Sequence, residues 1–128
     1  MSAPLFDKTV MIVEDDLILA ELFDEILNIS FCIKTAHSIS DAMACLQNTH
    51  IDAVVSDFHL GTQNADVIID WILQKQPELA SRTILMTGEC DATTRYQNKI
   101  AAVLFKPVDF NTLTEKVASL FVPQELQP

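Results

Sequence analysis

The sequence is poor in the residues that mark disulfide-rich, zinc-binding and membrane-spanning proteins. Its 128 residues include three cysteines and two glycines, and charged residues interrupt its hydrophobic runs. Three widely spaced cysteines without a Cys-x-x-Cys pair exclude a structural zinc site of the usual kind and argue against a disulfide framework. No hydrophobic run approaches the roughly 20 residues that cross a bilayer, and the first residues lack the pattern of a secretory signal. We therefore expect a cytoplasmic protein without a membrane segment.

Positive charge is also scarce. Eight Lys and Arg residues stand against 18 Asp and Glu residues, which gives a formal net charge of −10 at pH 7. A chain of this charge repels the phosphates of nucleic acids, which require a basic surface, so we expect no DNA or RNA partner. Excess negative charge suits cation binding or a basic protein partner, although solubility alone would also account for it.

The chain contains enough hydrophobic residues to form one core. The hydrophobic fraction is 49%, which is normal for a globular domain, and the length fits a single compact domain. We find no internal repeat, linker or low-complexity run. We expect one domain over residues 1–128, with a core from about 9 to 121 and a polar tail at 122–128.

Five short hydrophobic runs predict β-strands. Residues 9–13, 53–55, 83–86 and 101–105 are nearly continuous in hydrophobic and β-branched residues, which is typical of strands buried on both faces. Residues 32–36 alternate more in polarity and predict a strand nearer an edge of the sheet.

Between these runs, hydrophobic residues recur at helical spacing. Asp16 is placed to open the first helix, and Ser38 or Ser40 to cap the second. Pro77 marks the end of the third helix, and a more polar segment at 91–98 is a candidate fourth. The hydrophobic faces are Leu19, Leu22, Phe23, Ile26 and Leu27 in the first helix, Ile39, Ala42, Met43 and Leu46 in the second, Val67, Ile68, Trp71 and Ile72 in the third, and Leu113, Val117, Leu120 and Phe121 in the last.

Strands that alternate with helices predict an α/β fold. Five strands in this order indicate a five-stranded parallel sheet, doubly wound, with helices on both faces. In such sheets ligands bind outside the carboxyl ends of the strands, where the winding direction reverses. The residues that follow each strand are therefore the ones to inspect for chemistry.

Polar residues follow four of the five predicted strands. Glu14 and Asp15 come after the first, Asp57 after the third, Thr87 after the fourth and Lys106 after the fifth. If the fold is as predicted, three carboxylates, a hydroxyl and an amine converge on one pocket. Each feature alone has an ordinary explanation, because acids cap helices, Thr-Gly forms turns and Lys-Pro ends strands. Their joint occurrence in this order indicates a functional site.

Crowded carboxylates suit a divalent cation. Neighbouring carboxylates raise one another's pKa, and a cation removes that repulsion. Mg²⁺ prefers oxygen ligands and combines few protein carboxylates with water and phosphate oxygens. Asp15 and Asp57 suit direct ligation, and Glu14 could ligate directly or through water. We expect Mg²⁺, or Mn²⁺ in its place.

The same group of residues suits phosphoryl transfer. A carboxylate such as Asp57 is a nucleophile that can form an acyl phosphate, and it needs no separate general base because carboxylates are ionised at neutral pH. Transfer requires screening of the charge on the moving oxygens. The cation, the Lys106 ammonium and the Thr87 hydroxyl would supply it.

With these residues in view, the sequence resembles the receiver domains of response regulators, of the chemotaxis-regulator type, from about residue 9 to 121. The matching segments are 10–16 (VMIVEDD), 53–60 (AVVSDFHL), 83–88 (TILMTG) and 104–109 (LFKPVD). The resemblance implies a flavodoxin-like fold and a signalling role in a two-component system or phosphorelay. The chain would not be an enzyme in the ordinary sense, but a phosphoacceptor that assists its own phosphorylation and dephosphorylation.

The resemblance also implies a role for individual residues. Asp57 would take the phosphoryl group from a histidine kinase or a histidine phosphotransfer protein, and Thr87 and Lys106 would contact that group. Glu14, Asp15, Asp57 and the backbone carbonyl of His59 would hold the metal. The bond between Lys106 and Pro107 would be cis. A downstream effector or a second copy of the chain would bind the face formed by the fourth helix, the fifth strand and the last helix.

Three positions bear on the switch and its timing. The family commonly has an aromatic residue three positions before the lysine, and this chain has Val103 there. Phe105 shares a face with Val103 by strand alternation and could partly substitute. His59 and Glu89 lie two positions beyond Asp57 and Thr87, where the family tunes the lifetime of the acyl phosphate. The alternative is that His59 and Glu89 are ordinary loop residues exposed to solvent.

Three other functions are compatible with parts of the pattern. A phosphohydrolase that uses an aspartyl phosphate needs an acid two residues after the nucleophile, where this chain has His59, and a cap segment that 128 residues do not accommodate. A flavin-binding module needs a phosphate loop where Glu14, Asp15 and Asp16 would repel the phosphate. A degenerate receiver that acts only as a scaffold remains open because of Val103.

Overall fold

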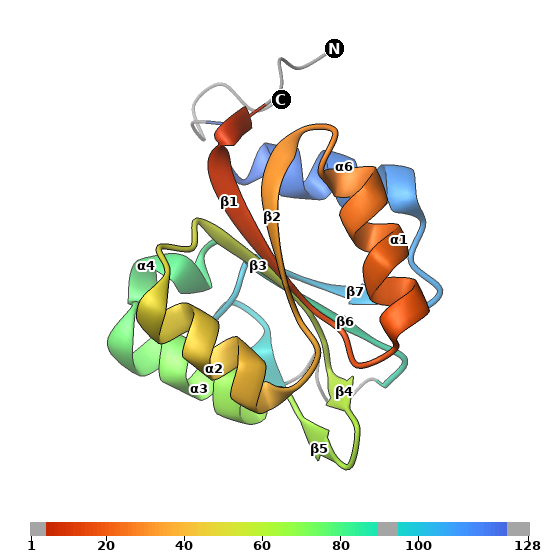
Figure 1. Cartoon of the computed structure of the whole chain (residues 1–128). Coiled ribbons are helices and arrows are strands. Elements are labelled where there is room, and N and C mark those ends of the chain that lie inside the picture. The colour runs from red at the N-terminus through yellow and green to blue at the C-terminus, as the bar shows by residue number, and fades with distance from the viewer. Residues whose placement is uncertain (1–4, 90–94, 123–128) are drawn as a thin grey trace.

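The computed structural model describes residues 5–89 and 95–122, and the chain forms an α/β fold in this part (Figure 1). The elements in chain order are β1 (Leu5–Val13), α1 (Leu17–Leu27), β2 (Phe31–Ala36), α2 (Ile39–Asn48), β3 (Ala53–Asp57), β4 (His59–Leu60), β5 (Gln63–Asn64), α3 (Asp66–Lys75), α4 (Pro77–Ala80), β6 (Thr83–Thr87), β7 (Ala102–Phe105) and α6 (Phe110–Ser119). No helix within the described ranges combines the length and the hydrophobicity that a membrane span needs.

Five strands form one parallel sheet in the order β2-β1-β3-β6-β7. The order confirms the predicted doubly wound sheet, because the chain winds outward in one direction from β1 and then in the other from β3. Helices α2 and α3 cover one face of the sheet, and α1 and α6 cover the other (Figure 1). The short strands β4 and β5, which the sequence did not predict, form a separate antiparallel hairpin after β3.

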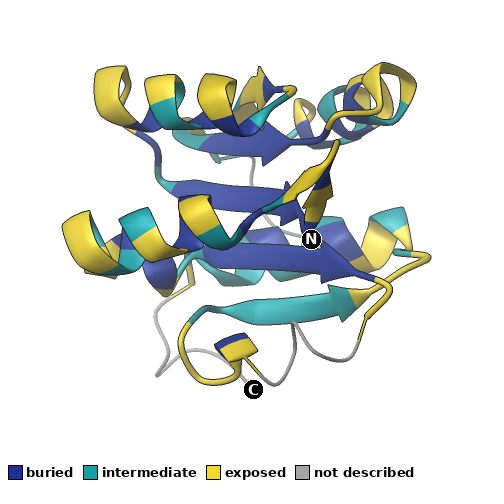
Figure 2. Cartoon of the chain, turned by 90° about the horizontal axis from the view of Figure 1, so that it is seen from below, coloured by how far each residue is buried: buried dark blue, intermediate teal, exposed yellow. Residues whose placement is uncertain are grey.

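The alternation of β1 shows how one hydrophobic run serves two cores. Val10 and Ile12 pack with Phe23 of α1, whereas Met11 and Val13 pack toward α2 and α3. Successive side chains of a strand point to opposite faces, so a strand covered on both sides is hydrophobic at most of its positions. β3 and β6 are buried along their whole length for the same reason (Figure 2).

Side chains at the helix starts define where each helix begins. The Asp16 carboxylate accepts hydrogen bonds from the backbone N–H groups of Ile18 and Leu19 at 3.0 and 3.1 Å. Ser38, rather than Ser40, caps α2, because its hydroxyl oxygen accepts the N–H of Asp41 at 3.0 Å. Such caps satisfy donors that the helix itself leaves free. The predicted cap of the first helix is thus confirmed, and the choice for the second is resolved.

Three predicted features of packing are wrong. β7 was expected to be buried on both faces, but it is an edge strand with intermediate burial, and Phe105 at its end is 50% exposed (Figure 2). A hydrophobic run does not reveal whether a further strand pairs with it. The predicted hydrophobic face of α3 included Val67, which is 50% exposed, and α3 buries Ile69 together with Ile68 and Ile72 instead. Leu22 of α1 is likewise exposed.

The segment predicted as the fourth helix lies partly outside the described residues. Residues 91–94 are among those not described, whereas residues 95 and 96 have helical conformation and Asn98 has a positive φ of 69°. β2, predicted to lie near an edge, does form an edge of the sheet. Most of the predicted tail, residues 123–128, is also outside the described part.

Candidate functional site

Four strand ends meet at the carboxyl edge of the sheet, and together they carry five of the predicted site residues. Glu14 and Asp15 follow β1, Asp57 ends β3, Thr87 ends β6 and Lys106 follows β7. The register of the sheet brings these ends level, because Asp57 pairs with Met86 and Thr87 pairs with Phe105. Parallel strands thus deliver residues from distant parts of the chain to one edge, as the sequence predicted.

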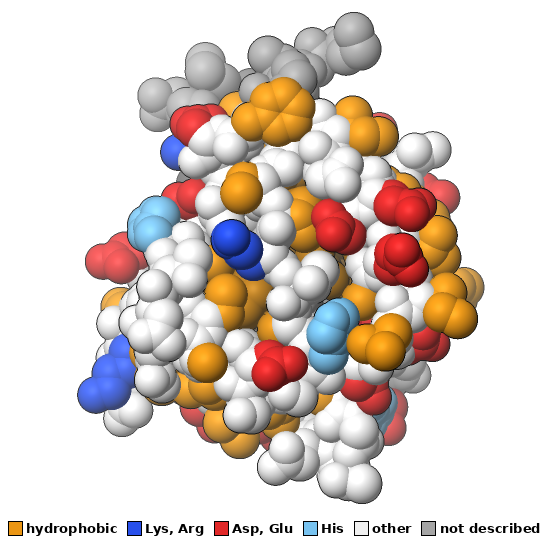
Figure 3. Space-filling view, in the orientation of Figure 1, with side chains coloured by type: hydrophobic (Ala, Val, Ile, Leu, Met, Phe, Trp, Pro, Cys, Tyr) orange, Lys and Arg blue, Asp and Glu red, His pale blue; other side chains and the backbone are white. Residues whose placement is uncertain are grey.

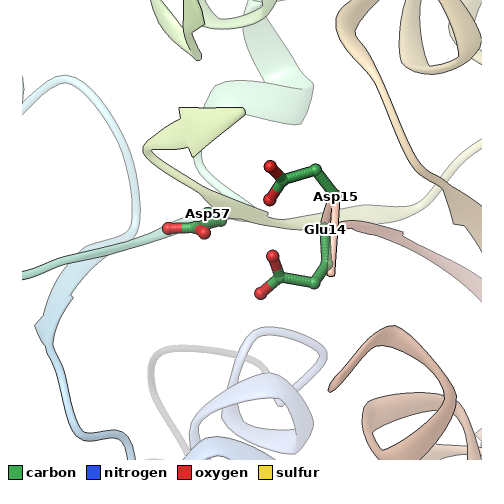
Figure 4. A group of neighbouring side chains, drawn as sticks. All are labelled: Glu14, Asp15 and Asp57. Atoms are coloured by element: carbon green, nitrogen blue, oxygen red, sulfur yellow. The ribbon is translucent and has the colours of Figure 1, made fainter. Parts of the chain in front are cut away.

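Three carboxylates form the centre of the site. Glu14, Asp15 and Asp57 each offer a carboxylate oxygen, and these oxygens lie within 4.8 Å of one another. Figure 4 shows the Glu14 and Asp15 carboxylates extending from the end of β1 toward the end of β3, where Asp57 lies. Glu14 is 1% exposed and Asp57 4% exposed, whereas Asp15 lies at the surface. Within the described part of the chain, the Glu14 Oε1 and Asp57 Oδ1 atoms are buried without a hydrogen-bond partner.

The crowding of these acids separates their pKa values. Burial raises the pKa of Glu14 to about 7, and the nearby negative charge of Asp57 adds to this effect. Burial also acts to raise the pKa of Asp15, but a hydrogen bond from the backbone N–H of Gly61, at 2.8 Å, and one with Glu14 outweigh it and leave this pKa below its usual value. Glu14 therefore holds a proton more readily than Asp15, and a cation at this position would compete with that proton.

Lys106 brings a positive charge to the phosphoacceptor candidate. Its Nζ lies 2.8 Å from Asp57 Oδ1. Because the same oxygen has no partner at hydrogen-bond angles, we describe this contact as an ion pair rather than an aligned hydrogen bond. The bond between Lys106 and Pro107 is cis, as expected. The backbone N–H of Lys106 donates to the carbonyl oxygen of Thr87 at 2.9 Å, which ties the loop after β7 to the end of β6.

The Thr87 side chain is buried in the sheet edge next to this group. It is 0% exposed, and its hydroxyl oxygen accepts the backbone N–H of Glu89 at 3.0 Å. An oxygen that accepts one hydrogen bond keeps its own O–H hydrogen to donate. Thr87 therefore has a donor for an oxyanion at the edge where Asp57 lies.

His59 and Glu89 form an ion pair that the sequence did not predict. His59 Nε2 lies 3.0 Å from Glu89 Oε1, and both side chains are about half exposed. The pair links the loop after β3 to the loop after β6, on either side of the site. The only signal in the sequence was their equal offset of two positions from Asp57 and Thr87.

The two remaining predicted residues, Val103 and Phe105, lie in β7. Val103 packs with the hydrophobic core on the α3 side of the sheet, and Phe105 lies beyond it at the exposed end of β7. Sequence reasoning missed Gly61, whose N–H binds the Asp15 carboxylate. Its positive φ of 66° is a conformation that favours glycine, so a glycine in the loop after Asp57 was the available signal.

Comparisons with known proteins give a consistent result. A family model described as response regulator receiver domain matches residues 10–118. No curated protein matches the chain. Among solved structures, the non-phosphorylated HemR receiver domain from Leptospira biflexa is 21% identical, with a TM-score of 0.81, and 91% of this chain and 97% of that one are covered.

Two further solved structures resemble the chain to a similar degree. A CheY-like receiver domain protein from Methanospirillum hungatei JF-1 is 21% identical, with a TM-score of 0.80 and coverage of 88% of this chain and 91% of that one. The response regulator protein TrrA from Thermotoga maritima, solved in complex with Mg²⁺ and BeF, is 22% identical, with a TM-score of 0.74 and coverage of 89% and 99%. Identities at this level show that the fold is shared.

Proposed function

Because the chain belongs to the response regulator receiver domain family, we propose that Asp57 accepts a phosphoryl group and that a divalent cation, Mg²⁺ or Mn²⁺, assists the transfer. The observation that carries this proposal is the position of the Asp57 carboxylate, which is buried, faces two other acids and lies 2.8 Å from the Lys106 ammonium. Family membership favours this function over the phosphohydrolase and flavin-binding alternatives.

The residues present fit a divalent cation. Three carboxylate oxygens within 4.8 Å of one another form a cluster of hard oxygen donors, and the buried Glu14 Oε1 without a hydrogen-bond partner is a further sign that the site is completed by a cation. Asp15, Asp57 and Glu14 would hold it, together with the backbone carbonyl of His59. When bound, the cation neutralises the charge that gathers on the phosphoryl oxygens.

Asp57, Lys106 and Thr87 have different roles in the proposed transfer. A carboxylate oxygen of Asp57 forms the new P–O bond while the bond between phosphorus and the donor breaks, and the electron pair of that bond leaves with the donor. The Lys106 ammonium, already paired with Asp57, then has a phosphoryl oxygen to bind. The Thr87 hydroxyl donates to another oxygen from the neighbouring strand end.

The donor is a histidine kinase or a histidine phosphotransfer protein under this proposal. The surface next to the site has hydrophobic side chains among acids, because Leu17, Ile18 and Leu22 of α1 are 63%, 74% and 41% exposed. Figure 3 shows Asp and Glu side chains gathered on the part of the surface that α1 forms. A protein donor that reaches Asp57 across this region needs matching hydrophobic contacts and positive charge.

His59 and Glu89 would influence how long the acyl phosphate survives. Their ion pair spans the loops on either side of Asp57, so it lies where water would approach the phosphorus atom. Signal output would use the face that includes β7 and α6 and bind an effector or a second copy of the chain. Val103 has no ring to rotate on that face, so output requires another moving group.

The experiment is incubation with acetyl phosphate and Mg²⁺, followed by intact-mass measurement. We expect the wild-type chain to gain the mass of one phosphoryl group, and EDTA to prevent the gain. The D57N variant should gain nothing, whereas D52N, which removes an acid at the other end of the same strand, should behave as the wild type. Unmodified wild-type protein, or modification of D57N, would contradict the proposal.

A further inference from the structure

Three side chains from distant parts of the sequence form a hydrogen-bonded group on the α3 side of the sheet. The Arg95 Nη1 atom lies 2.7 and 2.6 Å from the two carboxylate oxygens of Asp66. The Tyr96 hydroxyl donates to the same carboxylate. Asp66 is the first residue of α3, so this group fastens the segment before β7 to the start of that helix. We refer to Asp66, Arg95 and Tyr96 as the Asp66 latch.

The latch combines a buried part with an accessible part. Tyr96 is 3% exposed, so its hydroxyl depends on Asp66 for its hydrogen bond. The side chains of Arg95 and Asp66 are 48% and 28% exposed, so water and other charges reach their ion pair. The pKa of Asp66 lies below its usual value because burial, which acts to raise it, is outweighed by the Tyr96 and Arg95 contacts. The buried Tyr96 hydroxyl therefore depends on the Asp66–Arg95 ion pair, which a change in nearby charge can weaken.

The latch also touches the residue next to the phosphoacceptor. The Arg95 guanidinium carbon lies 6.0 Å from the centroid of the Phe58 ring, and Phe58 directly follows Asp57. The backbone of Phe58 is held on both sides, because its N–H donates to Met86 and its carbonyl oxygen accepts from Ala65, each at 2.8 Å. A change of charge or position at Asp57 therefore acts close to Arg95.

Space for movement lies beside Tyr96. A pocket of about 240 Å³ is lined by Tyr96, Ile100 and Val103 together with residues 97, 98, 101 and 102. Val103 is small enough to leave this space open at the edge strand. An aromatic ring that loses its anchor on Asp66 thus has room in an adjoining pocket.

From these observations we propose that the Asp66 latch is closed in the unphosphorylated chain and opens when Asp57 carries a phosphoryl group, so that Tyr96 and the segment 95–101 become the moving part of the switch. The inference rests on the proposed function and names the regulation of the same site. Tyr96 would supply the ring movement that Val103 cannot.

Charge balance gives the direction of the change. In the present state Lys106 is paired with Asp57, and Arg95 is paired with Asp66. A phosphoryl group replaces the single negative charge of the Asp57 carboxylate with about two, and the added charge attracts the Arg95 guanidinium away from Asp66. Asp66 then holds Tyr96 by a single contact. Because such coupling is reciprocal, a variant with a weakened latch must bind a phosphoryl mimic more tightly.

The experiment measures binding of beryllofluoride, a phosphoryl mimic, in the presence of Mg²⁺. Trp71 is the only tryptophan and lies in α3, so its fluorescence reports on the helix that the latch holds. We expect Y96F and R95Q to bind about fivefold to tenfold more tightly than the wild type. The matched variant K99Q keeps the latch and removes a positive charge from the same segment, so it should bind as the wild type.

Hydrogen exchange supplies a second measurement that does not depend on binding strength. In the wild type, backbone amides of 95–101 should exchange several-fold faster after beryllofluoride binds. In Y96F they should exchange fast already in its absence. R95Q alters an exposed side chain, so it tests the latch even if Y96F folds poorly.

The outcomes separate the two proposals. If the wild type binds beryllofluoride but Y96F and R95Q bind no better than K99Q, or if exchange of 95–101 does not change, the latch is overturned and the phosphoacceptor function stands. If the wild type neither binds beryllofluoride with Mg²⁺ nor gains mass from acetyl phosphate, the phosphoacceptor function fails and the latch fails with it.

Discussion

Strand β3 has an aspartate at each end, and the two differ in almost every respect except residue type. Asp52, just before the strand, accepts the backbone N–H of Thr9 at 2.8 Å and contacts His50 Nε2 at 2.9 Å. Asp57, its last residue, is 4% exposed and has a buried oxygen without a hydrogen bond at proper angles. Its neighbours are two acids and the Lys106 ammonium.

The difference distinguishes a carboxylate that is bound within the fold, that of Asp52, from one whose oxygens are available to a ligand, that of Asp57. Hydrogen bonds satisfy both oxygens of Asp52, so this residue stabilises the loop before β3. Asp57 lies among like charges, an arrangement that destabilises the folded chain until a cation neutralises it. Residue type alone does not distinguish the two, because their surroundings decide the role.

The largest expected effect is the response to Mg²⁺. A cation that binds only the folded chain stabilises it by about 2.7 kcal/mol at a hundred times its dissociation constant. We expect the wild-type and D52N chains to gain this stability, and D57N and D15N to lose most of it. Thermal unfolding with Mg²⁺ and with EDTA measures the gain. Equal gains in D57N and D52N would remove the contrast between the two ends of β3.

A smaller effect should appear in metal-free stability. D52N weakens hydrogen bonds to a charged acceptor, so it should lower the free energy of unfolding by about 1 to 2 kcal/mol. D57N removes a charge that faces Glu14 and Asp15, and should leave that free energy unchanged or raise it. Urea unfolding in EDTA compares the two. If D57N were the more destabilised variant, the carboxylate of Asp57 would be a structural group.

The third effect concerns the His59–Glu89 pair beside Asp57. H59Q and E89Q should each change the lifetime of the acyl phosphate by several-fold if the proposed function holds, because each removes one partner of the contact that joins the loops beside Asp57. H50Q is the matched control, since His50 pairs with Asp52 at the opposite end of the strand. Decay of phosphorylated protein, followed by intact mass, gives the lifetime. Lifetimes that match H50Q would assign His59 and Glu89 no such role.

The smallest effect is on the pH dependence of folding stability. Glu14, at the carboxyl edge of the sheet, and Asp52, before β3, should contribute with opposite sign. Glu14 has a pKa raised from 4.5 to about 7 in the folded chain, so its contribution to stability is full below about pH 4.5 and is lost as the pH rises through about 7. The pKa of Asp52 is lowered from 3.8, so its contribution is present above that value and is lost as the pH falls below it.

Two variants isolate these contributions in EDTA. E14Q should become more stable relative to the wild type as the pH rises from about 5 to about 8. D52N should approach the wild type in stability when the pH falls below about 4. E21Q, at an exposed position of α1, is the control for removal of a glutamate charge. A flat E14Q difference would mean that Glu14 titrates as an ordinary exposed residue.

The sequence predicted the sheet and the position of the site because both follow from local patterns. Buried parallel strands are mostly hydrophobic, so charged residues mark their ends in the sequence, and Glu14, Asp57 and Lys106 could be placed at one edge. Their specific roles came from family resemblance. The cap at Asp16 was also predictable, because capping depends on only a few neighbouring residues.

Features that depend on contacts between loops were not predictable. The His59–Glu89 pair and the Asp66 latch join residues about 30 positions apart through side chains whose spacing has no period. The wrong face of α3 has a different cause. Val67 and Ile69 are both β-branched and hydrophobic, so the helical pattern alone could not decide which of them faces the sheet.

The pairing of β7 with β6 has a consequence for the folding of the chain. Lys106 reaches Asp57 only after the last strand has joined the sheet, held there by bonds such as that from Ala101 N–H to Thr83 O at 2.9 Å. Such long-range parallel pairing is slow to form during folding. A chain in which β7 has not yet paired with β6 therefore exposes Asp57 without the Lys106 ammonium, and under the proposed function such a chain is a poor phosphoryl acceptor.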